Sequence, residues 1–227
     1  MLDVIEGRDK ELIVKYLREN KETLFGELEE VTCDMWDAYA NATTEVFGDK
    51  VKVTIDRFHV MANFQERLTE ARREIQRGLG KEEAKELKGS RWLWVKNREN
   101  LSAQERERLE ALEEKFPRLQ ELARQREGLR AIFEDTSISD AAEGERRLRE
   151  WMERALAVGL GGLVAFCKTL GNWMDKIANY FIWRSSNGRT EGFNHGLRAI
   201  LWRAFGMANF RNFRLRVLDR FGSPRKT

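Results

Sequence analysis

Two short β-type runs near the start of the chain, each followed by an aspartate, constrain its fold most strongly. The run at 31–33 is followed by Asp34, and the alternating apolar and polar residues at 51–55 are followed by Asp56. The stretch 36–47 between them has the spacing of a helix. In open α/β sheets, functional residues tend to lie at the carboxyl ends of strands. This part of the chain therefore predicts an α/β arrangement with both aspartates as candidate site residues.

A long helical block follows, because residues 58–182 contain almost no strand signal. Ser102 opens a capping box, Pro117 starts or interrupts a helix, and Asp140 can cap another. Charged residues make up 35% of the chain, which has only two prolines, so long solvated helices are favoured over disorder. Residues 1–5 could add a short strand. We predict an α/β, predominantly helical chain in three segments: 1–60, part of an α/β core; 61–182, an all-helical insertion; and 183–227, a site helix followed by a basic helix.

Several classes of protein are disfavoured by composition. Cys33 and Cys167 are too few for a disulfide framework, and a reduced cytoplasmic setting is expected. A zinc site built from Cys33, His59 and His195 lacks the usual spacing of ligand pairs. No stretch approaches about 18 uninterrupted apolar residues, so no membrane span is expected. The N-terminus lacks the basic and apolar regions of a signal peptide.

The basic character of the chain is concentrated at its C-terminal end. Residues 176–227 contain eleven Lys and Arg and two acidic residues, a net charge of +9, whereas the whole chain carries +3. A loop rich in Ser, Asn and Gly leads there into a helix whose first turn contains Glu191. A lone carboxylate on a basic, aromatic-rich surface suggests a metal ligand beside a phosphate backbone.

The helix that follows this loop has two different faces. Apolar residues fall on one side, while polar residues at spacings i, i+3, i+4 and i+7 from Glu191 fall on another. Few acids offset the arginines in and after this helix, which favours phosphate contacts. Most tryptophans are expected to pack helices, with Trp183 and Trp202 as candidates for stacking on a base. The expected DNA contacts are Asn194, His195, Arg198, Arg203, Arg211 and Arg214.

Three carboxylates are the candidates for catalysis: Asp34, Asp56 and Glu191. Phosphodiester chemistry with two metals uses such oxygen ligands to hold Mg²⁺, with Mn²⁺ as its usual substitute. Ordinary structural roles are the alternative for each residue. Aspartates cap helices that follow strands, and the helix macrodipole favours a glutamate in a first turn.

Six runs of residues, in one order, resemble the DDE transposases of the bacterial insertion-sequence L3 family. They extend over essentially the whole chain, and six in register are highly specific although no single run is decisive. The runs are VIEGRD at 4–9, DMWDAY at 34–39, DRFHV at 56–60, LKGSRWL at 87–93, KNRENL at 96–101 and SNGRTEGFN at 186–194.

The resemblance implies an RNase H-like fold with a helical insertion before the last catalytic acid. Asp34 matches the second acid of the DDE set and Glu191 matches its final glutamate, so both would be Mg²⁺ ligands. Asp56 and His59 match an accessory D-x-x-H element. The implied activity is Mg²⁺-dependent DNA strand cleavage and strand transfer. The implied partners are transposon ends, target DNA and other copies of the transposase, in a bacterial, nucleoid-associated setting.

The chain also departs from the family pattern. The first catalytic aspartate of the family lies on a strand that precedes the segment matched here, and Asp3 aligns with a non-catalytic residue. We therefore expect an incomplete core and little activity from this chain alone. Two alternatives stay open: a catalytically inactive fragment that binds DNA or the full-length transposase, and a metal-dependent nuclease unrelated to transposition.

Overall fold

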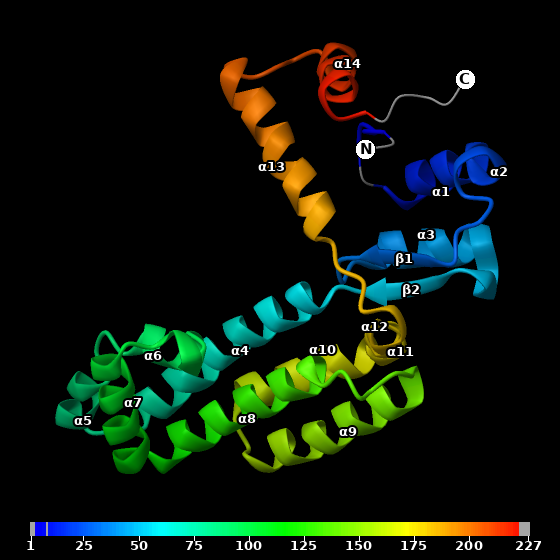
Figure 1. Cartoon of the computed structure of the whole chain (residues 1–227). Helices are drawn as coiled ribbons and strands as arrows, with labels where there is room; N and C mark the ends of the chain where they lie inside the picture. The colour runs from blue at the N-terminus through cyan, green and yellow to red at the C-terminus, as the bar shows by residue number, and fades with distance from the viewer. Residues whose placement is uncertain (1–2, 8, 223–227) are drawn as a thin grey trace. The chain divides into compact units, whose positions relative to one another are not determined.

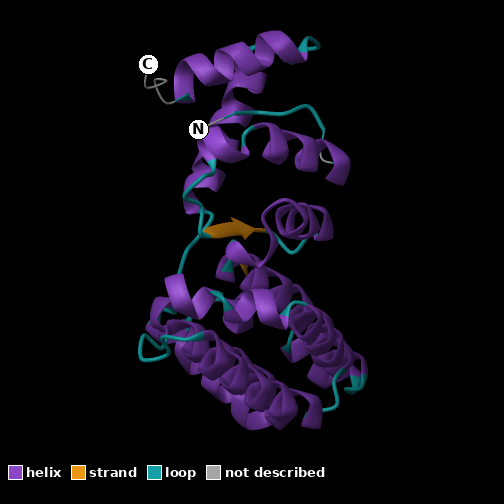
Figure 2. Cartoon of the chain, turned by 90° about the vertical axis from the view of Figure 1, so that its right-hand side faces the viewer, coloured by secondary structure: helices purple, strands orange, loops and turns teal. Residues whose placement is uncertain are grey.

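The computed structural model describes residues 3–7 and 9–222, with backbone only for Leu24 and Arg189. Most of the described chain is helical, and the strands form one small sheet (Figure 2). The chain divides into two compact units (Figure 1). The first unit contains Met1–Asp56 and Ser185–Thr227, and the second contains Arg57–Arg184. The sequence placed the corresponding changes after residues 60 and 182.

The sheet of the first unit consists of two parallel strands joined by a helix. Strand β1 (Glu30–Cys33) pairs with β2 (Lys52–Ile55), and Cys33 lies opposite Ile55 (Figure 1). The connection contains α3 (Asp37–Phe47) and the short helix η1 (Gly48–Lys50). A connection through a helix is what a parallel pair requires. Since Cys33 and Ile55 are in register, the residues that follow them leave the sheet at the same edge.

The core of the first unit lies between α3 and the N-terminal helix α1 (Lys10–Glu19). The buried residues are Ile13, Val14, Ala42, Val46, Phe47 and Val51. Ile5 and Phe25 pack against this cluster, and Phe25 follows the short helix α2 (Lys21–Leu24). The predicted strand at 1–5 is not present at residues 3–5, and residues 1 and 2 lie outside the described chain. Ile5 packs on the α1–α3 core instead of extending the sheet.

The C-terminal part of the first unit consists of α13 (Gly188–Arg203) and α14 (Phe210–Phe221). The rings of Phe193 and Phe221 lie edge to face, with centroids 5.9 Å apart. Gly196 permits this packing, because a Cβ at that position would lie 2.4 Å from the Phe221 ring. The side chain of Asn209 caps α14 by accepting a hydrogen bond from the Asn212 amide.

The described residues of the second unit form helices joined by loops, and none of them form a strand. The predicted capping box at Ser102 and the helix start at Pro117 are confirmed. The apolar stretch at 161–183 forms three helices, with breaks at Trp173 and Asn179. The elements are α4 (Arg57–Arg77), α5 (Lys81–Glu86), α6 (Arg91–Val95), η2 (Arg98–Asn100), α7 (Ala103–Lys115), α8 (Pro117–Glu134), α9 (Ala141–Ala157), α10 (Gly161–Asn172), α11 (Met174–Ala178) and α12 (Tyr180–Trp183).

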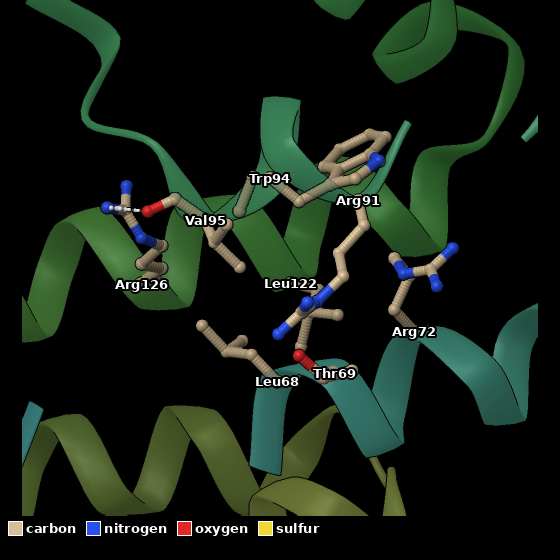
Figure 3. Close-up of a pocket in the computed structure, with 9 residues that line it drawn as sticks. Leu68, Thr69, Arg72, Arg91, Trp94, Val95, Leu122 and Arg126 are labelled. Carbon is tan, nitrogen blue, oxygen red and sulfur yellow. Dashed lines mark hydrogen bonds between the residues drawn. The ribbon is translucent and has the colours of Figure 1, made fainter. Parts of the chain in front are cut away.

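Close helix packing builds the core of the second unit. Phe64 of α4, Trp151 of α9 and Phe166 of α10 form a buried aromatic cluster. At Gly162 a Cβ would lie 2.3 Å from the Arg67 carbonyl oxygen, so a glycine is needed where α10 crosses α4. Packing of α6 leaves a pocket of only about 10 Å³ beside Leu68 (Figure 3), roughly the space of one water.

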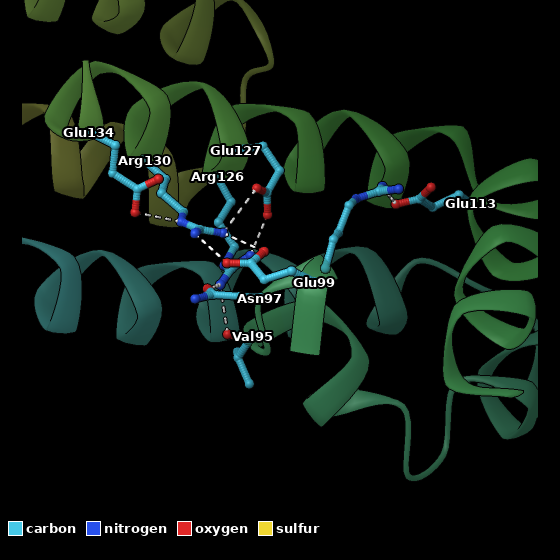
Figure 4. Close-up of polar contacts among 9 residues, drawn as sticks. Val95, Asn97, Glu99, Glu113, Arg126, Glu127, Arg130 and Glu134 are labelled. Atoms are coloured by element: carbon cyan, nitrogen blue, oxygen red, sulfur yellow. Dashed lines mark hydrogen bonds and ion pairs between the residues drawn. The ribbon is translucent and has the colours of Figure 1, made fainter. Parts of the chain in front are cut away.

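Charged side chains join the short segment at 95–99 to α8. Buried Arg126 donates to the Val95 carbonyl and to the Asn97 side chain, at 2.8 and 2.7 Å (Figure 4). Arg130 forms ion pairs with Glu99 and Glu134. The two arginines therefore hold the segment at 95–99 against α8.

Candidate functional site

The candidate site is the edge of the sheet where both strands end. Asp34 directly follows β1 and is exposed, whereas Asp56 directly follows β2 and is only 2% exposed. The backbone amide of Asp56 donates to the Cys33 carbonyl at 3.3 Å. The parallel register therefore brings the two predicted aspartates to the same edge.

Asn187 connects this edge to the start of α13. Its backbone amide donates to Asp56 Oδ2 at 2.7 Å, and its side-chain amide donates to Asp34 Oδ1 at 3.3 Å. Asn187 is also the N-cap residue of α13, yet its side chain makes no capping hydrogen bond to that helix. An asparagine at this position usually caps its own helix. Here it is directed toward the strand ends instead.

Glu191 lies in the first turn of the same helix and is half-buried. Its backbone amide donates to the Asn187 carbonyl at 2.9 Å, the first hydrogen bond of the helix. A carboxylate in this turn is favoured by the helix macrodipole. One loop thus contacts both strand-end aspartates and begins the helix that contains the third candidate acid.

The loop has a second attachment to the sheet. The hydroxyl of Ser185 donates to the Glu30 carboxylate at the start of β1. No role for Asn187 or Ser185 was predicted from the sequence. The sequence does contain a feature that could have indicated Asn187. It lies directly before a glycine at a helix start, within the SNGRTEGFN run.

The described residues contain no group of three or more His, Cys, Asp and Glu side chains placed to hold a metal ion. The donors that do meet at the sheet edge are carboxylate oxygens, the ligand type that suits Mg²⁺. Protein sites for this ion commonly supply one or two carboxylates, and water and substrate phosphates complete its shell. Asp34 and Glu191 supply oxygen donors of this type.

The predicted DNA-contacting residues of α13 point into solvent. Asn194, His195, Arg198 and Arg203 are all exposed. Three of the positions, with Glu191, follow the predicted spacing along one helix face. The face is therefore accessible to a large polyanion.

The two arginines predicted on α14 differ in their surroundings. Arg211 is exposed. Arg214 forms a bidentate ion pair with Asp3, with N–O distances of 2.7 and 2.8 Å. The hydrogen bonds that Arg214 donates to Asp3 raise the pKa of Arg214, while burial and the Asp3 charge raise the pKa of Tyr16. This ion pair joins α14 to the N-terminal segment, so both Arg214 and Asp3 have a structural role.

His59 lies in the first turn of α4, in the second unit, and is half-buried. Its ring packs edge to face against Phe58, with centroids 5.6 Å apart.

No helix in the described part of the chain is long and apolar enough to cross a membrane.

Comparisons with known proteins place the chain in a family. A family model of insertion-sequence L3 DDE proteins, described as transposase, matches residues 1–217. The transposase for insertion sequence element IS1001 of Bordetella parapertussis is 23% identical over 218 residues. That match covers 95% of this chain and 53% of the relative, so the chain spans about half of the relative's length. No solved structure matches significantly. The chain belongs to the insertion-sequence L3 family of DDE transposases.

Proposed function

We propose that this chain is the catalytic-domain portion of a DDE transposase with an RNase H-like core. It would take part in DNA strand cleavage at transposon ends and in transfer of the new 3′ hydroxyl to target DNA. The observation that supports this proposal most strongly is the Asn187 link. It joins Asp34 and Asp56, at neighbouring strand ends, to the first turn that contains Glu191.

Asp34 and Glu191 are the proposed metal ligands, for Mg²⁺ or for Mn²⁺ in its place. When bound, the ion would activate the attacking oxygen and stabilise the leaving oxygen. Asp34 is exposed, and its hydrogen bond from the Asn187 side-chain amide is long at 3.3 Å, so the carboxylate is accessible to a ligand from solvent. Buried Asp56 is proposed to hold the loop in place, and His59 is proposed as an accessory residue of the same function.

The exposed polar face of α13 is proposed to hold the DNA backbone. Arg198 and Arg203 would contact phosphates, and Asn194 and His195 would orient the strand. Such contacts release counterions from DNA, so affinity must fall steeply as salt rises. Self-association on DNA is also proposed, since two transposon ends are joined in one reaction, and sedimentation with and without DNA measures it.

Metal binding provides a test that does not depend on catalysis. The full chain is mixed with duplex DNA from the insertion-sequence end and titrated with Mn²⁺, and bound ion is followed by electron paramagnetic resonance. We expect Asp34→Asn and Glu191→Gln each to abolish a bound class that Asp49→Asn retains. Asp49 is an exposed acid of the same unit, in η1, and serves as the matched control. Equal Mn²⁺ binding by the wild-type chain and by the three variants would refute the assignment of the ligands.

DNA cleavage then separates the proposed function from its alternatives. Cleavage or joining that prefers insertion-sequence ends, needs Mg²⁺ and is lost in Glu191→Gln supports a transposase. Cleavage without preference for those ends identifies a nuclease. Salt-dependent DNA binding without any cleavage identifies a binding fragment. If the chain alone cleaves or joins insertion-sequence ends with Mg²⁺ and Asp3→Ala abolishes that activity, the expectation of an incomplete catalytic core is wrong.

A further inference from the structure

An exposed strip runs along α13 from its candidate acid to its C-terminal end. Glu191, His195, Arg198 and Trp202 are spaced four, three and four residues apart, so they share one face of the helix. Trp202 is 82% exposed. This face differs from the one that packs on α14, which includes Phe193. A tryptophan this exposed contributes little to the packing of the unit, so packing does not explain why a large aromatic side chain lies here.

The turn that ends α13 holds a second aromatic ring in solvent. The Gly206 amide donates to the Leu201 carbonyl at 2.9 Å, and the Phe205 amide donates to the Trp202 carbonyl at 3.1 Å. These two bonds form a Schellman motif, in which the position of Phe205 is usually a glycine because it adopts the left-handed conformation. Phe205 has φ 50° and a fully exposed side chain. The backbone is strained here without any gain from burial.

The same end of α13 is strongly basic. A groove of about 490 Å³ lies between α13 and α14, lined by Ile200, Arg203, Ala204, Arg216, Asp219 and Arg220. It contains three arginines and one acid. Arg198 adds a further exposed cation on the exposed strip that contains Trp202. Any molecule that covers the two rings must therefore also be compatible with a dense positive charge.

We propose that the C-terminal end of α13 binds unpaired bases of a DNA strand. Trp202 and Phe205 would stack on the bases, while Arg198 and the arginines of the groove would hold the phosphates. Every base has a face that can stack, and arginines neutralise the adjoining backbone, so a single strand satisfies both features at once. An apolar protein surface or a lipid interior would cover the rings but would leave the arginines desolvated without partners.

This proposal rests on the proposed function, because it assumes that α13 lies along DNA. The helix fixes the distance between the two parts of the strip. Glu191 and Trp202 are eleven residues apart, about 16 Å along a helix axis. That length corresponds to about five nucleotides of one strand in B-form DNA. The unpaired bases are therefore placed within about five nucleotides of the strand position at Glu191.

Fluorescence anisotropy with two labelled DNAs tests the proposal. One DNA is a fully paired insertion-sequence end, and the other has the same sequence with a mismatched bubble near the end. We expect the full chain to prefer the bubble. Stacking on one base is worth about a 5- to 150-fold change in affinity. Trp202→Ala should lose this factor for the bubble and change duplex affinity less than about two-fold, while Trp202→Phe keeps most of the preference.

Two further variants exclude a simple loss of structure. Phe205→Gly removes both the ring and the backbone strain. It should raise the melting temperature by about 2–4 °C and still weaken binding to the bubble. Leu156→Ala is the matched control, since Leu156 is an exposed apolar side chain of the second unit, on α9. It should leave both affinities unchanged.

The outcomes separate this inference from the proposed function. If the chain binds neither DNA, the proposed function fails and this inference fails with it. If the chain binds duplex DNA without preferring the bubble, or if Trp202→Ala weakens both DNAs equally, only this inference is overturned. It is also overturned if Trp202→Ala changes binding to lipid vesicles or the oligomeric state while bubble affinity stays constant.

Discussion

The structure predicts that the two strand-end aspartates contribute very differently to stability. Asp56 is 2% exposed and accepts the Asn187 amide at 2.7 Å, whereas Asp34 is exposed and its bond from the Asn187 side chain measures 3.3 Å. Replacing Asp56 with alanine removes a charged acceptor from a site that water does not reach. It also leaves a backbone amide without that acceptor. The same replacement at Asp34 removes a side chain that water surrounds, and its bond from Asn187 is long.

The magnitudes follow from these geometries. A hydrogen bond to a charged group is worth about 1.5–3 kcal/mol, and burial at Asp56 leaves little solvent to compensate. Asp56→Ala should therefore lower the free energy of unfolding of the first unit by about 1.5–3 kcal/mol, or the melting temperature of that unit by roughly 6–24 °C. Asp34→Ala should stay within about 0.5 kcal/mol, as exposed sites usually do. Asp56→Asn retains an acceptor and should fall between them.

Hydrogen exchange with mass spectrometry is the appropriate assay, because the chain has two units and a single melting curve combines them. Asp56→Ala should speed exchange in peptides from 185–195, while peptides from α9 and α10 keep wild-type protection. Asp34→Ala should leave both regions unchanged and still lose Mn²⁺. If Asp56→Ala destabilises the first unit no more than Asp34→Ala does, Asp56 does not anchor the loop and the reasoning from burial is wrong.

Three further predictions concern the second unit. Gly144→Ala should cost about 1–3 kcal/mol in denaturant unfolding, because the new Cβ would lie 2.1 Å from the Phe181 ring. Hydrogen bonding to Arg130 lowers the pKa of Glu99 from 4.5 to about 2. The resulting stabilisation is complete above pH 4.5 and is lost as the pH falls toward 2, so Glu99→Gln should flatten this part of the stability profile measured in urea. Burial raises the pKa of Cys167 to about 11, so thiol reagents at neutral pH should label it, by mass spectrometry, only after unfolding.

The parts of the fold that depend on neighbouring residues were predictable from the sequence. Alternation at 51–55 and the aspartate after it located β2, and the S-x-x-E signal at Ser102 located the start of α7. Gly206 forms part of the turn that ends α13, a position where glycine is common. Local patterns determine each of these features, so a single sequence is sufficient.

The remaining features depend on contacts between distant parts of the chain. Arg214 lies in a stretch of sequence where few acids offset the arginines, yet it forms an ion pair with Asp3, which is 211 positions away. The break at Trp173 divides an apolar stretch whose periodicity favours one helix. In the same way, the capping preference of Asn187 predicts a bond within α13, but the strand-end aspartates are stronger acceptors and take its amides. Composition and spacing contain no information about such competition between partners.

The two ends of α13 meet different physical demands, and these demands fit the separate roles proposed for them. At its N-terminal end, Asn187 fixes the backbone to both strands, which suits a carboxylate that must be held in one position for chemistry. At its C-terminal end, Phe205 occupies a strained and exposed conformation that packing does not require. A helix is stiff over this length, so a base stacked on Trp202 would be held at a fixed distance from a phosphate at Glu191. Binding energy gained at the exposed end could then position the strand at the anchored end, which is how contacts remote from the reacting bond assist catalysis.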